Sequence, residues 1–235
     1  MTEFLLSLLQ IIIVNIVLSG DNAVVIALAC RNLNPELQKK AVFWGSFGAI
    51  GLRVILTFIA IYLLKIPLVQ VVGGLLLIWI AVKLLKGEDE DSHIGGGANM
   101  MEALKTIIFA DLIMSLDNVI AVAGAANGNM LLVLIGLAIS IPLIIWGSQL
   151  LMKLMNRFPI IVLLGAALLG YTAGEMVVGD KLVGGFIEET LPALHIILPV
   201  ALALVVIAVG NYLKRKAEKE KEKANQIGQD HAETL

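Results

Sequence analysis

Long apolar stretches recur along this 235-residue chain, and they constrain its fold more than any other feature. The hydrocarbon core of a bilayer is about 30 Å thick, and a helix needs about 20 apolar residues to cross it. The stretches of about this length are residues 4–30, 41–64, 66–86, 103–126, 130–153, 158–180 and 192–213. We therefore predict an all-α, polytopic membrane protein with seven transmembrane helices.

The composition excludes a soluble globular domain. Hydrophobic residues make up 59% of the chain, charged residues make up 15%, and the mean hydropathy is +0.93. Soluble domains average about 45–50% apolar and about 25% charged residues, so the lipid bilayer is the first partner that we expect. The net charge of −2 does not indicate a nucleic-acid partner. The single cysteine, Cys30, cannot form an internal disulfide or a zinc cluster.

The sequence contains no pattern typical of an enzyme. We find no nucleophile paired with a base, no glycine-rich phosphate loop and no fingerprint of a nucleotide cofactor. We therefore expect that the protein is not an enzyme and that it uses no organic cofactor.

Two polar segments lie outside the predicted spans, and the basic residues predict the orientation. Residues 87–100 form an acidic loop, and residues 214–235 form a charged tail whose first part we expect to extend the last helix. Lysine and arginine mark the cytoplasmic side of membrane proteins. With the N-terminus outside and the C-terminus in the cytoplasm, only Lys65 and Lys181 lie on the outer side. The inner loops and ends then hold Arg31, Lys39, Lys40, Lys86, Lys105, Lys153, Arg157 and the cluster at 214–223.

Polar residues recur in the same order in the first and fourth predicted spans. Residues 12–30 read IIVNIVLSGDNAVVIALAC, and residues 108–126 read IFADLIMSLDNVIAVAGAA. A constant offset of 96 residues aligns Asn15 with Asp111, Ser19 with Ser115, Asp21 with Asp117, Asn22 with Asn118, and Arg53 with Gln149. The chain therefore contains an internal repeat.

The repeat unit contains three predicted spans. The first copy covers about residues 4–86 and the second about residues 103–180, while the span at 192–213 lies outside the repeat. Because three is an odd number, the second copy enters the membrane from the opposite side. Inverted repeats are a recurrent transporter architecture, with the binding site near the midplane where the two halves meet.

Six charged side chains fall inside the predicted spans and away from the span ends. A charge at the centre of a membrane helix costs roughly 2.5–3.5 kcal/mol on insertion scales, so such groups should face the bundle interior and meet partners. The six are Asp21, Asp111, Asp117, Glu175, Arg53 and Lys83. Their excess of two negative charges would be neutralised by one divalent cation or by two protons. Alternation between the two would constitute cation/proton exchange.

The donors near the repeated motifs are hard oxygen ligands. Such ligands favour magnesium, calcium or manganese over copper or zinc. The candidate metal ligands are Asp21, Asn22, Asp117, Asn118, Asp111, Glu175, Ser19, Ser115 and Asn15. Helix packing is the alternative role for Asn15, an interfacial charge for Glu175, and a helix-end acid for Asp111.

Two cations are candidate counter-ions. We expect Arg53 to meet a carboxylate and to hold the site when no metal is bound. Lys83 is the second candidate, with snorkelling to the inner surface as its alternative.

The geometry of the motif aspartates is open. In an unbroken helix Asp21 and Asp117 point about 120° away from the face that their motif neighbours share. A helix break near Ser19 would redirect Asp21, whereas Leu116 stands where the first copy has Gly20.

The motifs SGDN at 19–22 and SLDN at 115–118 resemble those of the TerC family of bacterial membrane proteins, and the resemblance extends over about residues 4–213. It implies a place in the bacterial cell membrane and a relation to LysE-type exporters, which share three-span repeats. It also implies a role in manganese homeostasis, through export from the cytoplasm and supply of the metal to secreted enzymes. The metal ligands that it implies are Asp21, Asn22, Asp117 and Asn118.

Our leading hypothesis is a secondary transporter that exports manganese(II), the transported ion, with proton exchange as the candidate coupling. One alternative is a LysE-like exporter of cationic amino acids or other small solutes, which a larger cavity with an aromatic lining would favour. Another is a metallation factor that supplies metal to secreted proteins and has the secretion machinery or secreted metalloenzymes as partners. The sequence does not distinguish a channel from a carrier.

Overall fold

The computed structural model describes residues 20–63, 66–86, 96–125 and 130–233, and for some helical residues, 117–125 among them, it describes the backbone alone. These described ranges contain eight helices and no strand. The helices are α2 (Gly20–Cys30), α3 (Pro35–Leu63), α4 (Val69–Lys86), α5 (Gly96–Ala125), α6 (Met130–Arg157), α7 (Ile160–Gly179), α8 (Lys181–Thr190) and α9 (Leu194–Glu233).

The helices overlap the predicted spans, and several are suited to a bilayer. Four segments in the described ranges are long and apolar enough to cross a membrane: Val69–Lys86, Ala138–Arg157, Ile160–Gly179 and Leu194–Ala217. The fold is therefore all-helical, as expected of a polytopic membrane protein. The total of seven spans stays a prediction, because the described part of the first span, α2, has 11 residues.

Three helical segments differ from the sequence expectations. Helix α8 was not predicted; it begins where the Asp180 carboxylate accepts a hydrogen bond from the backbone of Leu182 at 3.1 Å. Helix α5 begins at Gly96, inside the predicted loop. Helix α9 extends beyond 213, as expected for the first part of the charged tail, but it continues farther than expected, to Glu233, because alternating Glu and Lys residues support a solvated helix.

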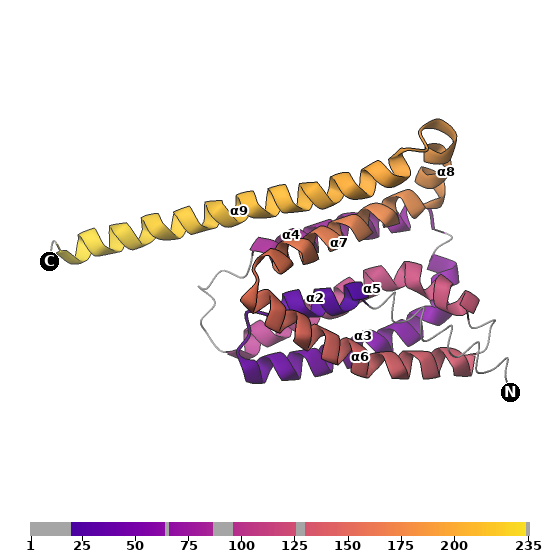
Figure 1. Ribbon diagram of the computed structural model, residues 1–235, viewed down its shortest axis with the longest axis horizontal. Coiled ribbons are helices and arrows are strands. Elements are labelled where there is room, and N and C mark those ends of the chain that lie inside the picture. The colour runs from indigo at the N-terminus through magenta and orange to yellow at the C-terminus, as the bar shows by residue number, and fades with distance from the viewer. Residues whose placement is uncertain (1–19, 64–65, 87–95, 126–129, 234–235) are drawn as a thin grey trace.

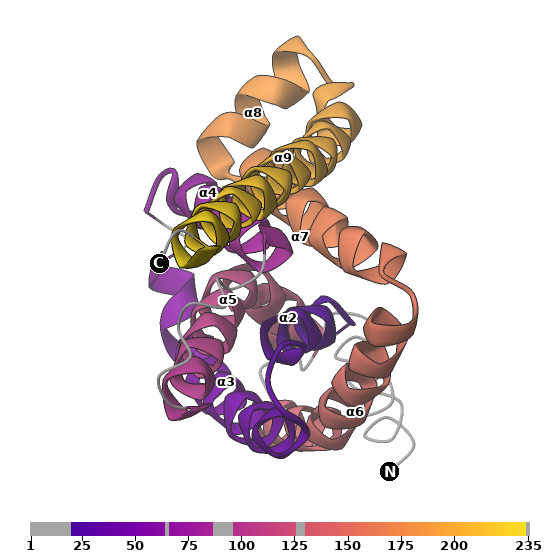
Figure 2. The ribbon, with the colours of Figure 1, turned by 90° about the vertical axis from the view of Figure 1, so that its left-hand side faces the viewer.

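The helices α2 to α7 form a bundle around α2. Successive helices alternate in direction (Figure 1), so α2 and α5 run antiparallel, as do α3 and α6, and α4 and α7. Helix α2 contacts α3, α5, α6 and α7, which surround it when the bundle is viewed from one end (Figure 2). Accordingly, almost every side chain of α2 from Asn22 to Cys30 is buried.

The helix contacts occur in matching pairs. Helix α3 packs along α5, and α6 packs along α2; α4 touches α5, and α7 touches α2. Three further contacts join each helix to its counterpart at the sequence repeat: α2 with α5, α3 with α6, and α4 with α7. Helix α9 lies outside this scheme and packs across α7 and α4 (Figure 1).

The outer surface of the bundle is apolar. Large side chains such as Trp79 on α4 and Ile196 and Leu204 on α9 are 59%, 72% and 61% exposed. Exposed apolar area on this scale fits contact with lipid rather than with water.

One end of the bundle collects basic residues, and we call it the basic end. The beginnings of α3, α5 and α7 and the ends of α2, α4 and α6 meet there, on the left in Figure 1. The helix-terminal basic residues at this end are Arg31, Lys39, Lys40, Lys86, Lys105, Lys153 and Arg157.

Small residues let α7 and α9 approach closely. A β-carbon added at Gly170 would lie 2.9 Å from the Ala203 Cα, and one added at Gly174 would overlap the backbone of Pro199. Such spacing of small residues four apart is typical of membrane helix interfaces.

We predict that Gly174→Ala destabilises the protein by about 1–3 kcal/mol, because the added methyl group must push α9 away from α7. Thermal unfolding of the purified protein in detergent measures this as a lower midpoint. Gly51→Ala is the matched control, since no heavy atom lies within 4 Å of the added carbon; it should be neutral or stabilise by up to about 1 kcal/mol. Equal midpoints for the two variants would contradict the packing account.

Candidate functional site

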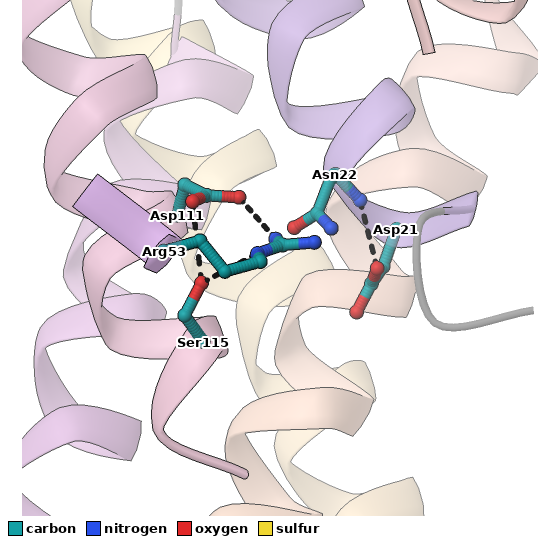
Figure 3. Close-up of polar contacts among 5 residues, drawn as sticks. All are labelled: Asp21, Asn22, Arg53, Asp111 and Ser115. Atoms are coloured by element: carbon teal, nitrogen blue, oxygen red, sulfur yellow. Dashed lines mark hydrogen bonds and ion pairs between the residues drawn. The ribbon is translucent and has the colours of Figure 1, made fainter. Parts of the chain in front are cut away.

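A buried ion pair joins α3 to α5. A terminal guanidinium nitrogen of Arg53 donates to Asp111 Oδ1, and Arg53 Nε donates to Ser115 Oγ at 3.0 Å. The Ser115 hydroxyl in turn donates to Asp111 Oδ2 at 3.2 Å. The exposed fractions of Arg53, Asp111 and Ser115 are 3%, 6% and 0%, so the cluster is sealed from solvent (Figure 3).

The helical spacing of α5 explains why two of its side chains meet the same guanidinium. Asp111 and Ser115 are four residues apart and share a face of the helix. Helix α5 runs without interruption from Gly96 to Ala125, so the fourth span is not broken at the SLDN motif. The open question about that span is thereby answered, whereas Ser19, where the first span would break, lies outside the described residues.

Asp21 and Asn22 of α2 lie on the other side of the Arg53 guanidinium (Figure 3). Asn22 is buried, and Asp21 is half-buried, with its Oδ1 accepting from the Asn22 backbone N–H at 2.8 Å. The Asp21 carboxylate is within electrostatic range of both Arg53 and Asp111. The guanidinium therefore stands between carboxylates from two helices that correspond in the sequence repeat.

A small cavity adjoins this cluster. Asn22 and Asp111 line it together with apolar residues of α2, α3 and α5, and its volume is about 10 Å³. A space of this size holds about one water molecule. It is large enough for a single small ion in place of water.

The chemistry of the cluster is that of hard oxygen ligands held by one cation. It combines two carboxylates, an amide and a hydroxyl with a guanidinium. Within the described ranges no three His, Cys, Asp or Glu side chains group closely enough to hold a metal ion by themselves. A cation bound here would therefore also use neutral oxygens.

The structure describes the other motif residues only in part or not at all. Asn15 and Ser19 lie outside the described residues, and for Asp117 and Asn118 the structure describes only the helical backbone. Their roles as ligands stay predictions. Glu175 is described, and it is exposed on α7, unlike the buried members of the cluster.

Lys83 does not join the Arg53 cluster. It pairs with Glu102 of α5, both side chains are about two-fifths exposed (39% and 43%), and its Nζ lies 5.7 Å from the centre of the Trp79 ring. Sequence reasoning did not single out Glu102. Their positions in the sequence could have indicated the pair. Lys83 lies near the end of one predicted span and Glu102 at the start of the next, so both side chains reach the same membrane surface.

Comparison with known proteins gives relatives over nearly the whole chain. A family model described as "Integral membrane protein TerC family" matches residues 1–218. The uncharacterized membrane protein YjbE of Bacillus subtilis (strain 168) is 43% identical over 213 residues, which cover 91% of this chain and 97% of YjbE.

Two further relatives are more distant. The uncharacterized membrane protein YceF of the same organism is 24% identical over 219 residues, which cover 89% of this chain and 82% of YceF. A UPF0053 protein of Buchnera aphidicola subsp. Schizaphis graminum (strain Sg) is 22% identical over 237 residues, which cover 90% of this chain and 45% of that protein. No solved structure matches the chain.

We predict that Arg53→Gln destabilises the protein by about 3–5 kcal/mol, because it leaves Asp111 buried without its cation. The double variant Arg53→Met with Asp111→Leu should recover most of that loss, since it removes both charges. Thermal unfolding in detergent measures both.

The matched control is Lys83→Gln, which removes a cation from a pair that is half-exposed. It should change stability by no more than about 1 kcal/mol. If Arg53→Gln is as mild as this control, the buried pair is not what holds α3 to α5.

Proposed function

The chain belongs to the TerC family of integral membrane proteins, and from this premise we propose that it is a secondary transporter that exports manganese(II) from the cytoplasm. The observation that carries the proposal is the buried cluster of Arg53, Asp111 and Ser115 beside Asp21 and Asn22. Ionisable groups inside membrane helices are costly, and they mark ion and substrate pathways.

The Arg53 guanidinium takes the place of the transported cation when no metal is bound. In the described arrangement its guanidinium neutralises the oxygens of Asp111. An entering divalent ion would compete for the same oxygens and would displace the guanidinium. The carboxylates of Asp21 and Asp111 would then balance the charge of the ion, with Asn22 and Ser115 as neutral oxygen donors.

An inverted repeat supports this reading. Its two halves would contain α2 to α4 and α5 to α7, and the matching helix contacts and opposite directions described above are those that such a repeat requires. The contact of α2 with α5 brings the two motif-bearing helices together inside the bundle. Transporters with inverted repeats bind their substrates at such an interface.

The dimensions of the cavity favour an ion over an amino acid. A volume of about 10 Å³ suits one small ion and excludes a lysine or arginine molecule. The donors are oxygens, which favours manganese, magnesium or calcium over softer metals. Supply of manganese to secreted metalloenzymes would follow from the same export step and needs no second site.

The orientation in the membrane follows from the basic end. We place this end, together with the C-terminal part of α9, in the cytoplasm, in accordance with the excess of lysine and arginine on cytoplasmic sides. The N-terminus then lies outside, and the transported ion enters from the basic end of the bundle.

We predict that Asp21→Asn and Asp111→Asn each reduce manganese transport at least about tenfold, because each variant removes a charge-assisted contact worth about 1.5–3 kcal/mol. The measurement is uptake of labelled manganese into inside-out vesicles. Glu189→Gln, at an exposed position of α8, is the control and should transport like the unmodified protein. Undiminished transport by both aspartate variants would reject the site.

Proton coupling gives a separate prediction. Carboxylates must lose protons to bind metal, so an exchanger returns protons against the metal. Acidifying the lumen of inside-out vesicles should therefore accelerate manganese uptake, and making the bath more acidic than the lumen should slow it. Uptake that depends on the manganese gradient but not on the pH gradient would indicate a channel or an uncoupled carrier.

A further inference from the structure

A second polar cavity lies at the basic end of the bundle and is lined by none of the Arg53 cluster. Its volume is about 430 Å³, within the range of about 300–1,000 Å³ that is typical of small-molecule sites. Residues from four helix ends and from the middle of α9 line it: the four are the chain just after α2, the ends of α4 and α6, and the start of α7.

The polar part of the lining is cationic and rich in amides. It contains Arg31 and Lys214 together with Asn32, Asn156 and Asn211. Among the described residues that line the cavity there is no carboxylate. A cavity with two positive charges, amide donors and no internal anion is complementary to a negatively charged ligand.

Arg31 provides the most specific signal. One terminal nitrogen of its guanidinium donates to the Leu84 carbonyl at 2.9 Å. The other terminal nitrogen is buried and has no hydrogen-bond partner among the described residues. A buried charged donor without an acceptor is costly. An acceptor oxygen from a ligand would remove that cost.

The start of α7 adds to the positive potential of the cavity. Ile160 begins this helix, and Pro159 at its N-cap makes no side-chain capping hydrogen bond. Both residues line the cavity. The N-terminus of a helix carries a partial positive charge and attracts anions such as phosphate.

The remaining lining is apolar and indicates what accompanies the anionic group. Leu85, Met155, Ile160 and Leu163 contribute hydrocarbon surface. Basic pockets between membrane helices on the cytoplasmic side bind the head groups of anionic lipids. An anionic phospholipid would place its phosphate against the cations and its glycerol and acyl region against this surface.

We propose that this cavity binds a phosphate group, with Arg31 and Lys214 as its charge partners and Asn156 and Asn211 as amide donors. The chemistry is shared by two sources, an anionic phospholipid of the adjacent leaflet and free inorganic phosphate. The site is independent of the transported metal and of the Arg53 cluster.

The test uses the full chain purified in a neutral detergent. A ligand that binds only the folded state raises the thermal unfolding midpoint, and the shift grows with the logarithm of the ligand concentration above Kd. The midpoint is titrated with phosphatidylglycerol against phosphatidylcholine, and separately with inorganic phosphate against chloride at equal ionic strength. We expect phosphatidylglycerol, inorganic phosphate or both to raise the midpoint progressively with concentration, by more than phosphatidylcholine or chloride does.

Variants identify the cavity as the place of binding. Arg31→Lys keeps a positive charge but loses the planar donor fork, and Lys214→Gln removes a charge without touching the Leu84 contact. Each should weaken the apparent affinity at least about tenfold, the effect of losing a charged hydrogen bond. Lys39→Gln, which removes a charge from an exposed position outside the cavity, is the matched control and should leave the affinity within about twofold.

The outcomes decide both the site and the source. Binding of phosphatidylglycerol alone assigns the site to a lipid, and binding of inorganic phosphate assigns it to a soluble anion. The absence of any shift beyond that given by phosphatidylcholine or chloride overturns the proposal, as does equal weakening by Lys39→Gln, which would indicate unspecific surface charge.

Discussion

The ion pair between Arg53 and Asp111 can exist only because α3 and α5 lie close enough to exclude solvent and lipid from it. Glycines make this approach possible: a β-carbon at Gly45 would lie 2.8 Å from Ile107, and one at Gly48 would lie 3.1 Å from Ile108. With water excluded, each charge is stabilised mainly by the other. Removal of one leaves the other buried and unpaired, which costs several kcal/mol of folding free energy. A buried pair is by itself weak evidence for stability. We therefore attribute its presence to a function that needs exchangeable charge.

The charge pair joins the two halves of the sequence repeat, and its repeat-related counterpart is uncharged. The offset of 96 residues aligns Arg53 with Gln149 and Asp111 with Asn15. The contact of α3 with α5 thus carries a cation from one half and an anion from the other, where the repeat-related positions hold two neutral amides. Both combinations are balanced, whereas a mixed one would leave a single charge in the bundle.

Sequence reasoning identified the members of the cluster but could not select their contacts. Because a charge in a bilayer is costly, the sequence predicted that Arg53 pairs with a carboxylate. It did not show whether the partner is Asp111 or Asp21, because the partner depends on how α3 is rotated about its axis relative to α5. The helix periodicity predicted that Asp111 and Ser115 share a face. The basic cavity was not predicted at all, because four helix ends and the middle of α9 build it, and no local pattern connects Arg31, Asn156 and Lys214. Helix α8 was not predicted because its local signal is a single capping residue, Asp180, within an otherwise apolar region.

The two sites lie at different depths and have opposite charge preferences, which bears on ion entry. A divalent cation that approaches from the basic end meets lysine and arginine residues before it reaches the oxygens of Asp21 and Asp111. Positive charges act over about 8 Å in physiological salt, and they would lower the local concentration of the cation. A phosphate group held by Arg31 and Lys214 would cancel part of that potential without entering the ion path. With phosphate bound, the cavity would then favour entry of the cation at the basic end, where the lysine and arginine residues otherwise repel it.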